Sequence, residues 1–162
     1  MKANSLIVAT LLFAMTLSIM IVPSWMLWMR PEFTLMVLVY WAMAIPDRFG
    51  LLPAMLVGLF QDSLTATVIG EHMLGYVLVV SFVLFTYQRL RMLGAWQQAF
   101  VIFFLFAGAQ FLESRLAIMT GQQLIGWWWL MPAFSSALLW PWLMVSLRIL
   151  RRKLRVLNKF YE

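Results

Sequence analysis

Ionisable and amide side chains stand inside two of the most apolar stretches of this sequence. The run VGLFQDSLT contains Gln61 and Asp62, and the run AGAQFLESR contains Gln110 and Glu113. An ionised carboxylate in hydrocarbon costs about 3 kcal/mol on insertion scales, so it normally faces a packed or functional interior. Side chains of these types could hydrogen-bond one helix to another, or could pass a proton or a substrate along an interior path.

Enzyme chemistry has few candidate residues. The single histidine, His72, follows Glu71, and a lone Glu-His pair between two apolar segments is typical of a solvated loop. The sequence contains no HExxH motif, no glycine-rich phosphate loop and no Ser/His/Asp set. Because there is no cysteine, a disulfide, a thiolate metal site and a cysteine nucleophile are excluded. We therefore predict a protein that is not an enzyme and has no catalytic residue, metal or cofactor.

The composition indicates the environment of these side chains. Of the 162 residues, 64% are hydrophobic and only 11% are charged, and the mean hydropathy is +0.90. A soluble globule of this size would have too few charged residues to cover its surface. The sequence therefore predicts an all-α, polytopic membrane protein with a single integral membrane domain over residues 1–162.

This length accommodates about six transmembrane helices with short connections. Charged pairs separate the first spans, and Pro31 and Pro132 each suit a first helical turn. The second helix is so short that we expect neighbouring helices to shelter its ends. The predicted spans cover residues 5–26, 31–45, 51–69, 73–87, 95–116 and 132–150.

The distribution of basic residues predicts the orientation. With the N-terminus in the cytoplasm, only Arg30 and Arg115 of the 12 Lys and Arg residues fall on the outer side. The excess of basic residues on the inner side follows the positive-inside rule. An even number of spans then places both termini in the cytoplasm. The net charge of +6 therefore reports topology, and we predict no nucleic-acid partner. The basic residues on the inner side are Lys2, Arg48, Arg89, Arg91, Arg148, Arg151, Arg152, Lys153, Arg155 and Lys159.

The third and fifth spans would then rise in the same direction. From the rise of a helix, Asp62 lies about 16 Å and Gln110 about 22 Å above the start of its span. We expect the amide and carboxylate side chains of these two spans to form a polar contact between the helices. Asp62 is then either an inter-helix hydrogen-bonding group, in which case Asp62→Asn should be tolerated, or part of a proton or substrate pathway. A structural bend at Gly58 and Gly70 is a third alternative.

The C-terminal stretch LRILRRKLRVLNKF combines apolar and basic residues at helical spacing. It predicts that the last span continues as a basic amphipathic helix over residues 150–160, on the membrane surface. This tail either anchors the chain to anionic lipid or docks a cytoplasmic partner. The basic residues concerned are Arg151, Arg152, Lys153 and Arg155.

Short motifs occur in a characteristic order: RPEF, YWAMAIPDR, GLFQD, GEHMLGY, AWQQA, and LLWPW followed by the basic tail. Their order and spacing over residues 30–153 resemble the rod shape-determining protein MreD family of bacteria. The resemblance marks a set of residues as structural or partner-contact candidates. They are Arg30, Pro31, Tyr40, Trp41, Pro46, Arg48, Gly58, Asp62, Gly70, Gly75, Trp140 and Pro141.

The resemblance also implies a function. Members of this family are multi-pass proteins of the bacterial inner membrane, and they act as non-catalytic components of the cell-elongation (rod) complex, which gives rod shape and lateral peptidoglycan synthesis. The implied partners are MreC, MreB, RodA and the transpeptidase (penicillin-binding protein) that works with RodA. The family is also similar in fold to the substrate-capture subunits of energy-coupling-factor vitamin transporters. Capture of a small molecule is therefore the alternative function.

Overall fold

The computed structural model describes residues 2–20, 23, 29–47, 49–119, 121 and 129–159. Within these ranges the backbone forms six helices and no strand, which confirms the all-α prediction for this part of the chain. The helices are α1 (Lys2–Ile19), α2 (Phe33–Ala44), α3 (Leu51–Thr65), α4 (Glu71–Met92), α5 (Ala95–Met119) and α6 (Met131–Lys159).

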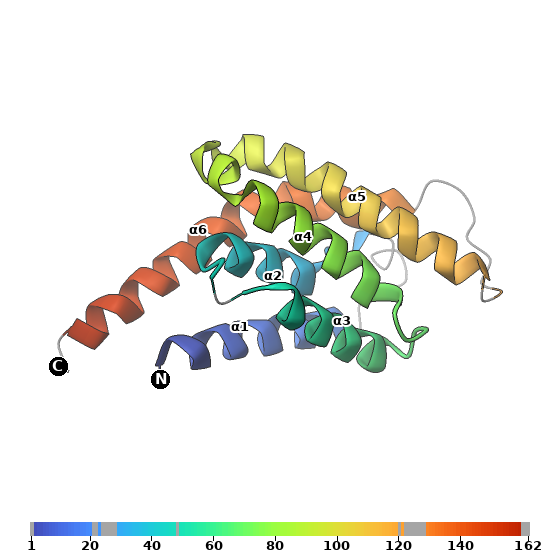
Figure 1. Cartoon of the computed structure of the whole chain (residues 1–162), viewed down its shortest axis with the longest axis horizontal. Coiled ribbons are helices and arrows are strands. Elements are labelled where there is room, and N and C mark those ends of the chain that lie inside the picture. Colours follow the sequence, from blue (N-terminus) through green and yellow to red (C-terminus); the bar gives the residue numbers. More distant parts are fainter. Residues whose placement is uncertain are drawn as a thin grey trace.

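Successive helices run in opposite directions, so α1 begins and α6 ends on the same side of the bundle, at the left of Figure 1. The two sides differ in charge. We call the side where α1 begins the basic end, because it holds Arg89, Arg91, Arg148, Arg151 and Arg152. The opposite side is the acidic end, because it holds Glu32, Asp62, Glu71 and Glu113.

Helix α2 forms the core of the bundle. Every residue from Thr34 to Met43 is buried, and α1, α4 and α6 pack around this helix. Its 12 residues give a length of about 18 Å, which is shorter than a hydrocarbon layer of about 30 Å. The prediction that neighbouring helices shelter a short second helix is therefore confirmed.

The lengths and exposed surfaces of the helices are those of a membrane protein. Three segments are long and apolar enough to cross a membrane: α4, α5 and the Met131–Lys153 part of α6. The apolar parts of α1, α2 and α3 are shorter. Large apolar side chains are exposed, including Phe60, Phe85 and Phe100. Such surface is stable against lipid rather than water. The prediction of a helical membrane protein is confirmed.

Several helices differ in extent from the predicted spans. Helix α1 ends at Ile19 rather than at residue 26, and α3 ends at Thr65 rather than at residue 69. Ala66 follows α3 in the left-handed conformation, with φ of 52°, which stops the helix. By contrast, α4 covers Glu71–Met92 rather than residues 73–87, and α5 continues to Met119 rather than 116. The predicted spans rest on the hydropathy of the side chains, whereas a helix ends where its backbone conformation changes.

Pro132 and the helical state of the tail agree with the sequence prediction, whereas Pro31 does not. Pro132 lies in the first turn of α6, as predicted, whereas Pro31 precedes α2, which begins at Phe33. Pro141 lies inside α6 and is buried. Helix α6 continues through Lys159, so the basic tail extends the last predicted span as one helix.

Two glycines allow α4 to pack closely between α3 and α5. A Cβ atom added to Gly58 in α3 would lie only 2.5 Å from the Met73 Cα atom in α4. A Cβ atom added to Gly75 in α4 would lie 2.7 Å from Glu113 Oε1 in α5. The Gly58 contact is with backbone, which cannot move without displacing a helix.

Asp62 caps the N-terminus of α4 from the neighbouring helix α3. Its two carboxylate oxygens accept hydrogen bonds from the backbone N–H groups of Gly70 and His72, each at 2.8 Å. The His72 Nδ1 atom also lies 2.9 Å from Asp62 Oδ1. The first N–H groups of a helix lack partners within it, and the helix dipole favours a negative charge there. Asp62 is therefore fully buried yet fully hydrogen-bonded.

The contact at Gly58 predicts that Gly58→Ala destabilises the protein. The added methyl group must push α3 away from the Met73 backbone, and overpacking of this kind costs about 1–3 kcal/mol. Gly108→Ala in α5 is the matched control, because a Cβ atom there has nothing within 4 Å. We expect the control to keep or raise the melting temperature in detergent and Gly58→Ala to lower it. Equal melting temperatures for the two variants would contradict the close approach.

The cap geometry predicts that Asp62→Asn is also destabilising, contrary to the expectation from the sequence. Each carboxylate oxygen accepts a hydrogen bond from a backbone N–H group. In the Asp62→Asn variant the side-chain NH₂ group would replace one of these oxygens and would face a backbone N–H donor. A buried unsatisfied donor costs about 1–3 kcal/mol. We expect a lower melting temperature and a lower protein level for Asp62→Asn, while Asp47→Asn, at an exposed position, stays at wild-type values. An unchanged Asp62→Asn protein would show that the cap is dispensable.

Candidate functional site

Two adjoining cavities lie at the acidic end of the bundle. One has a volume of about 310 Å³ and the other about 170 Å³. Glu32 and Glu71 line both. The larger cavity is also lined by Ser18, Arg30, Pro31, Gln61, Thr65, Thr67 and His72, and the smaller one also by Gln110, Glu113, Ser114, Ala117, Trp129 and Pro132.

A chain of hydrogen bonds joins α1, α2 and α3 beside the larger cavity. Ser18 Oγ lies 3.0 Å from Thr34 Oγ1, which donates to Gln61 Oε1 at 3.0 Å. The backbone N–H of Glu32 donates to Ser136 Oγ in α6 at 2.8 Å. The four side chains in these bonds are buried. Polar residues at the start of α2 therefore tie three other helices to it.

Arg30, the basic residue of this region, caps the C-terminus of α1. Its Nη2 atom donates to the backbone carbonyls of Leu17 at 3.0 Å and Met20 at 3.2 Å. A cation is favoured at this end of a helix, where carbonyl groups lack partners within the helix. Pro31 follows Arg30 and lines the larger cavity.

The predicted polar contact between the third and fifth spans is wrong. Helix α4 packs between α3 and α5. Asp62 binds the N-terminus of α4, and Gln61 accepts a hydrogen bond from Thr34. Gln110 and Glu113 instead line the smaller cavity. The side-chain amide of Gln110 is buried with no hydrogen-bond partner among the described residues. The height of a residue along a helix follows from the sequence, but the lateral order of the helices does not.

The prediction of a solvated loop for Glu71 and His72 is also wrong. Both residues lie in the first turn of α4; Glu71 is buried and the side chain of His72 is only 13% exposed. Glu71 Oε2 has no partner in the part of the chain that the structure describes. Among those residues no group of three or more His, Cys, Asp or Glu side chains could hold a metal ion. The acidic end offers hydrogen bonding and negative charge.

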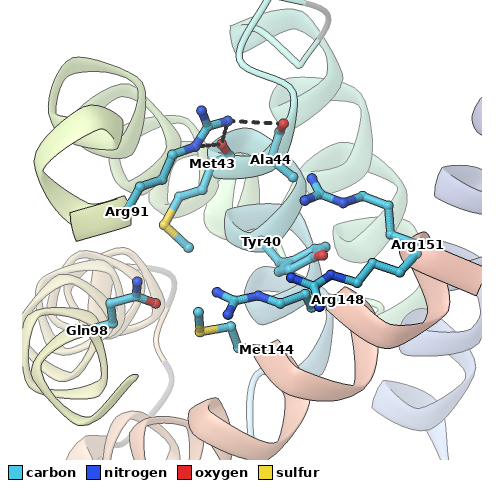
Figure 2. Close-up of a pocket in the computed structure, with 9 residues that line it drawn as sticks. Tyr40, Met43, Ala44, Arg91, Gln98, Met144, Arg148 and Arg151 are labelled. Atoms are coloured by element: carbon cyan, nitrogen blue, oxygen red, sulfur yellow. Dashed lines mark hydrogen bonds between the residues drawn. The ribbon is translucent and has the colours of Figure 1, made fainter. Parts of the chain in front are cut away.

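A cavity of about 460 Å³ lies at the basic end, between α2, α4, α5 and α6 (Figure 2). Tyr40 in α2 and four arginine side chains line it, and the described lining residues include no carboxylate. Figure 2 shows Arg91 beside the end of α2, and Tyr40 beside Arg148 and Arg151 of α6. The arginines are Arg91, Arg148, Arg151 and Arg152.

Arg91 caps the C-terminus of α2 in the same way that Arg30 caps α1. Its Nε atom donates to the Met43 carbonyl at 2.7 Å, and its Nη2 atom donates to the carbonyls of Met43 and, at 3.0 Å, Ala44. The guanidinium carbon also lies 5.3 Å from the centre of the Tyr87 ring, a cation–π distance. Arg91 thus fixes one wall of the cavity.

The two tryptophans marked by the family pattern hold helices together. Trp41 Nε1 in α2 donates to Thr10 Oγ1 in α1 at 2.9 Å. Trp140 Nε1 in α6 donates to Gln98 Oε1 in α5 at 3.2 Å, and Gln98 in turn donates to the Leu90 carbonyl near the end of α4 at 2.8 Å. Both indole rings are buried, so their N–H groups need these partners.

The remaining predicted candidates are dispersed. Pro46 lies in the turn after α2, and Gly70 adopts a left-handed conformation with φ of 105° just before α4. Lys153 is exposed and is not among the residues that line the basic cavity. Arg48 and the side chain of Arg155 lie outside the described residues.

Arg91 and Arg148 belong to the basic cavity, although the sequence predicted them only as inner-side charges. Part of the signal was available, because Arg148, Arg151 and Arg152 are spaced three and four residues apart and share one helix face. Arg91 and Tyr40 come from distant helices. Only the packing of α2 and α4 against α6 brings them to the same cavity.

Comparisons with known proteins agree with the motif resemblance. The sequence model of the rod shape-determining protein MreD family matches residues 2–150. A protein of Haemophilus influenzae (strain ATCC 51907 / DSM 11121 / KW20 / Rd) named rod shape-determining protein MreD is 30% identical over 129 residues, which cover 79% of each chain. No solved structure matches this chain. Because the family match covers nearly the whole bundle, including both ends with their capped helices, the chain belongs to the rod shape-determining protein MreD family.

Proposed function

We propose that this protein is a non-catalytic scaffold of the bacterial cell-elongation machinery, in the inner membrane, where it supports rod shape and lateral peptidoglycan synthesis. Membership of the MreD family is the observation that carries the proposal. The partners that we propose are MreC, MreB, RodA and the transpeptidase that works with RodA. The protein contributes binding surfaces to this assembly rather than a reaction.

The distribution of polar and apolar side chains supports a scaffold. Buried polar groups such as Thr34, Gln61 and Gln98 are bonded between helices, where they fix the shape of the bundle. The outer surface carries large apolar side chains, with Trp96, Phe100 and others exposed along α5. Helices associate in a membrane through close packing of such side chains, so this surface suits partner helices as well as lipid.

In the proposed orientation the basic end faces the cytoplasm and the acidic end faces the periplasm. The support is the positive-inside rule, since most of the described lysines and arginines, including Arg89, Arg91 and Arg148, lie at the basic end. In this orientation the cavities lined by Glu32 and Glu71 face periplasmic partners. The tail of α6 then lies at the cytoplasmic surface, where anionic lipid and cytoplasmic partners can reach it.

The orientation predicts a pattern of chemical labelling, which the absence of native cysteine makes simple to test. Single cysteines replacing Ile69 or Met119, both exposed at the acidic end, should react with an impermeant thiol reagent added to intact spheroplasts. Cysteines replacing Asp47 or Gln97, both exposed at the basic end, should react only after the membrane is permeabilised. The reverse pattern would overturn the orientation, and labelling of all four sites in intact spheroplasts would overturn the six-span topology.

The scaffold role predicts the effect of depletion in a rod-shaped host. Cells should become round while the membrane stays intact, and a tagged copy that restores the rod should co-purify with MreC and RodA. Vitamin uptake should stay normal, because only the alternative function, capture of a small molecule for transport, would require this protein for uptake. Persistence of rods after full depletion, or recovery of a transporter ATPase module in place of MreC and RodA, would refute the proposal.

A further inference from the structure

The described residues that line the basic cavity bring four guanidinium groups together and include no carboxylate. In the described part of the chain the only salt bridge joins His72 and Asp62, at the other end of the bundle. Arg91 is engaged with the α2 carbonyls, which carry only partial negative charge. Three further guanidinium groups, those of Arg148, Arg151 and Arg152, line the same cavity from one face of α6. Like charges brought together in this way repel each other, and an anion bound between them relieves the repulsion.

Tyr40 provides a second and independent indication of a ligand. Only 5% of the surface of this residue is exposed, and it lines the cavity beside Arg148 and Arg151 (Figure 2). Its hydroxyl group has no hydrogen-bond partner among the described residues. Buried polar groups in native proteins are nearly always hydrogen-bonded, and an unpaired one calls for an unseen partner. A phenolic O–H beside the guanidinium groups of Arg148 and Arg151 is suited to donate to an anionic oxygen.

Phosphate is the anion that best fits this set of donors. Guanidinium groups bind phosphate oxygens with paired N–H donors, and several arginines around one cavity can bind several oxygens at once. The cavity lies where the apolar part of α6 ends, within the Met131–Lys153 segment that could cross a membrane. Val145 and Ile149, on the same part of α6, are about half exposed. A phosphate bound by Arg148 would therefore have apolar surface beside it for acyl chains.

We propose that the basic cavity binds the headgroup of an anionic phospholipid, with Tyr40, Arg148 and Arg151 contacting its phosphate oxygens. Basic pockets between membrane helices recognise lipids in this way. The number of arginines favours a lipid with two phosphates, such as diphosphatidylglycerol, over one with a single phosphate. The inference does not depend on the scaffold function, because binding of lipid by the purified protein is its readout.

The proposal is tested on the full-length protein, purified in detergent and stripped of lipid. Diphosphatidylglycerol in mixed micelles should raise the melting temperature, and native mass spectrometry should detect it bound to the protein. Phosphatidylcholine should do neither. The variant Arg148→Gln/Arg151→Gln should bind diphosphatidylglycerol at least about tenfold more weakly, since it loses two charge-assisted contacts.

The double variant Arg89→Gln/Lys153→Gln is the matched control. It removes two exposed positive charges from the same end of the bundle, but neither residue lines the cavity. We expect its affinity for the lipid to stay close to that of the wild type. Equal weakening in both double variants would show that the lipid responds to overall charge, and would overturn the cavity as a site.

Tyr40→Phe separates a ligand contact from a structural role. Removal of an unpartnered buried hydroxyl should leave the melting temperature of the lipid-free protein unchanged or higher, while affinity for diphosphatidylglycerol falls by about tenfold. A purely structural tyrosine would instead lower the melting temperature in both states. Inorganic pyrophosphate is the final arm: if it alone gives the full shift, the occupant is a soluble phosphate and the lipid proposal is wrong.

Discussion

The ends of helices inside a membrane protein carry backbone groups that cannot turn to water, and this constraint organises the whole bundle. Hydrocarbon offers no hydrogen bonds, so each unpaired N–H or C=O group must find a partner within the protein. Here three helix ends are each capped by a charged side chain from another part of the chain. Arg30 caps the C-terminus of α1, Arg91 that of α2, and Asp62 the N-terminus of α4. In each case the charge opposes that of the helix dipole.

The caps explain how a helix as short as α2 can form the core. Its end is held by Arg91, and its beginning is held by Thr34 and by the Glu32 backbone through Ser136. Between these ends its side chains are enclosed by α1, α4 and α6. The long helices α4, α5 and α6 then provide the length that α2 lacks.

The same caps place charge at opposite ends of the molecule. Asp62 and the neighbouring glutamates gather where α3 ends and α4 begins, around the two cavities at the acidic end. Arg91 and the arginines of α6 gather around Tyr40 at the other end. A member of the MreD family thus presents two chemically distinct polar surfaces, separated by a bundle whose sides are apolar. In the proposed orientation, partners on the two sides of the membrane would meet different chemistry.

The sequence by itself determined the protein class, the helical fold and the family, because these depend on composition, on the length of apolar runs and on the order of short motifs. It also showed that Asp62 needs partners and that α2 needs shelter. Only the tertiary structure decided which groups bind Asp62 and which helices enclose α2. Gln110 lies at a suitable height for Asp62, yet α4 lies between their helices and supplies backbone N–H groups instead. Periodicity sets the height and face of a side chain, whereas lateral neighbours depend on the packing of all six helices together. The basic cavity has the same origin, since Tyr40, Arg91 and Arg148 meet only when α2, α4 and α6 pack together.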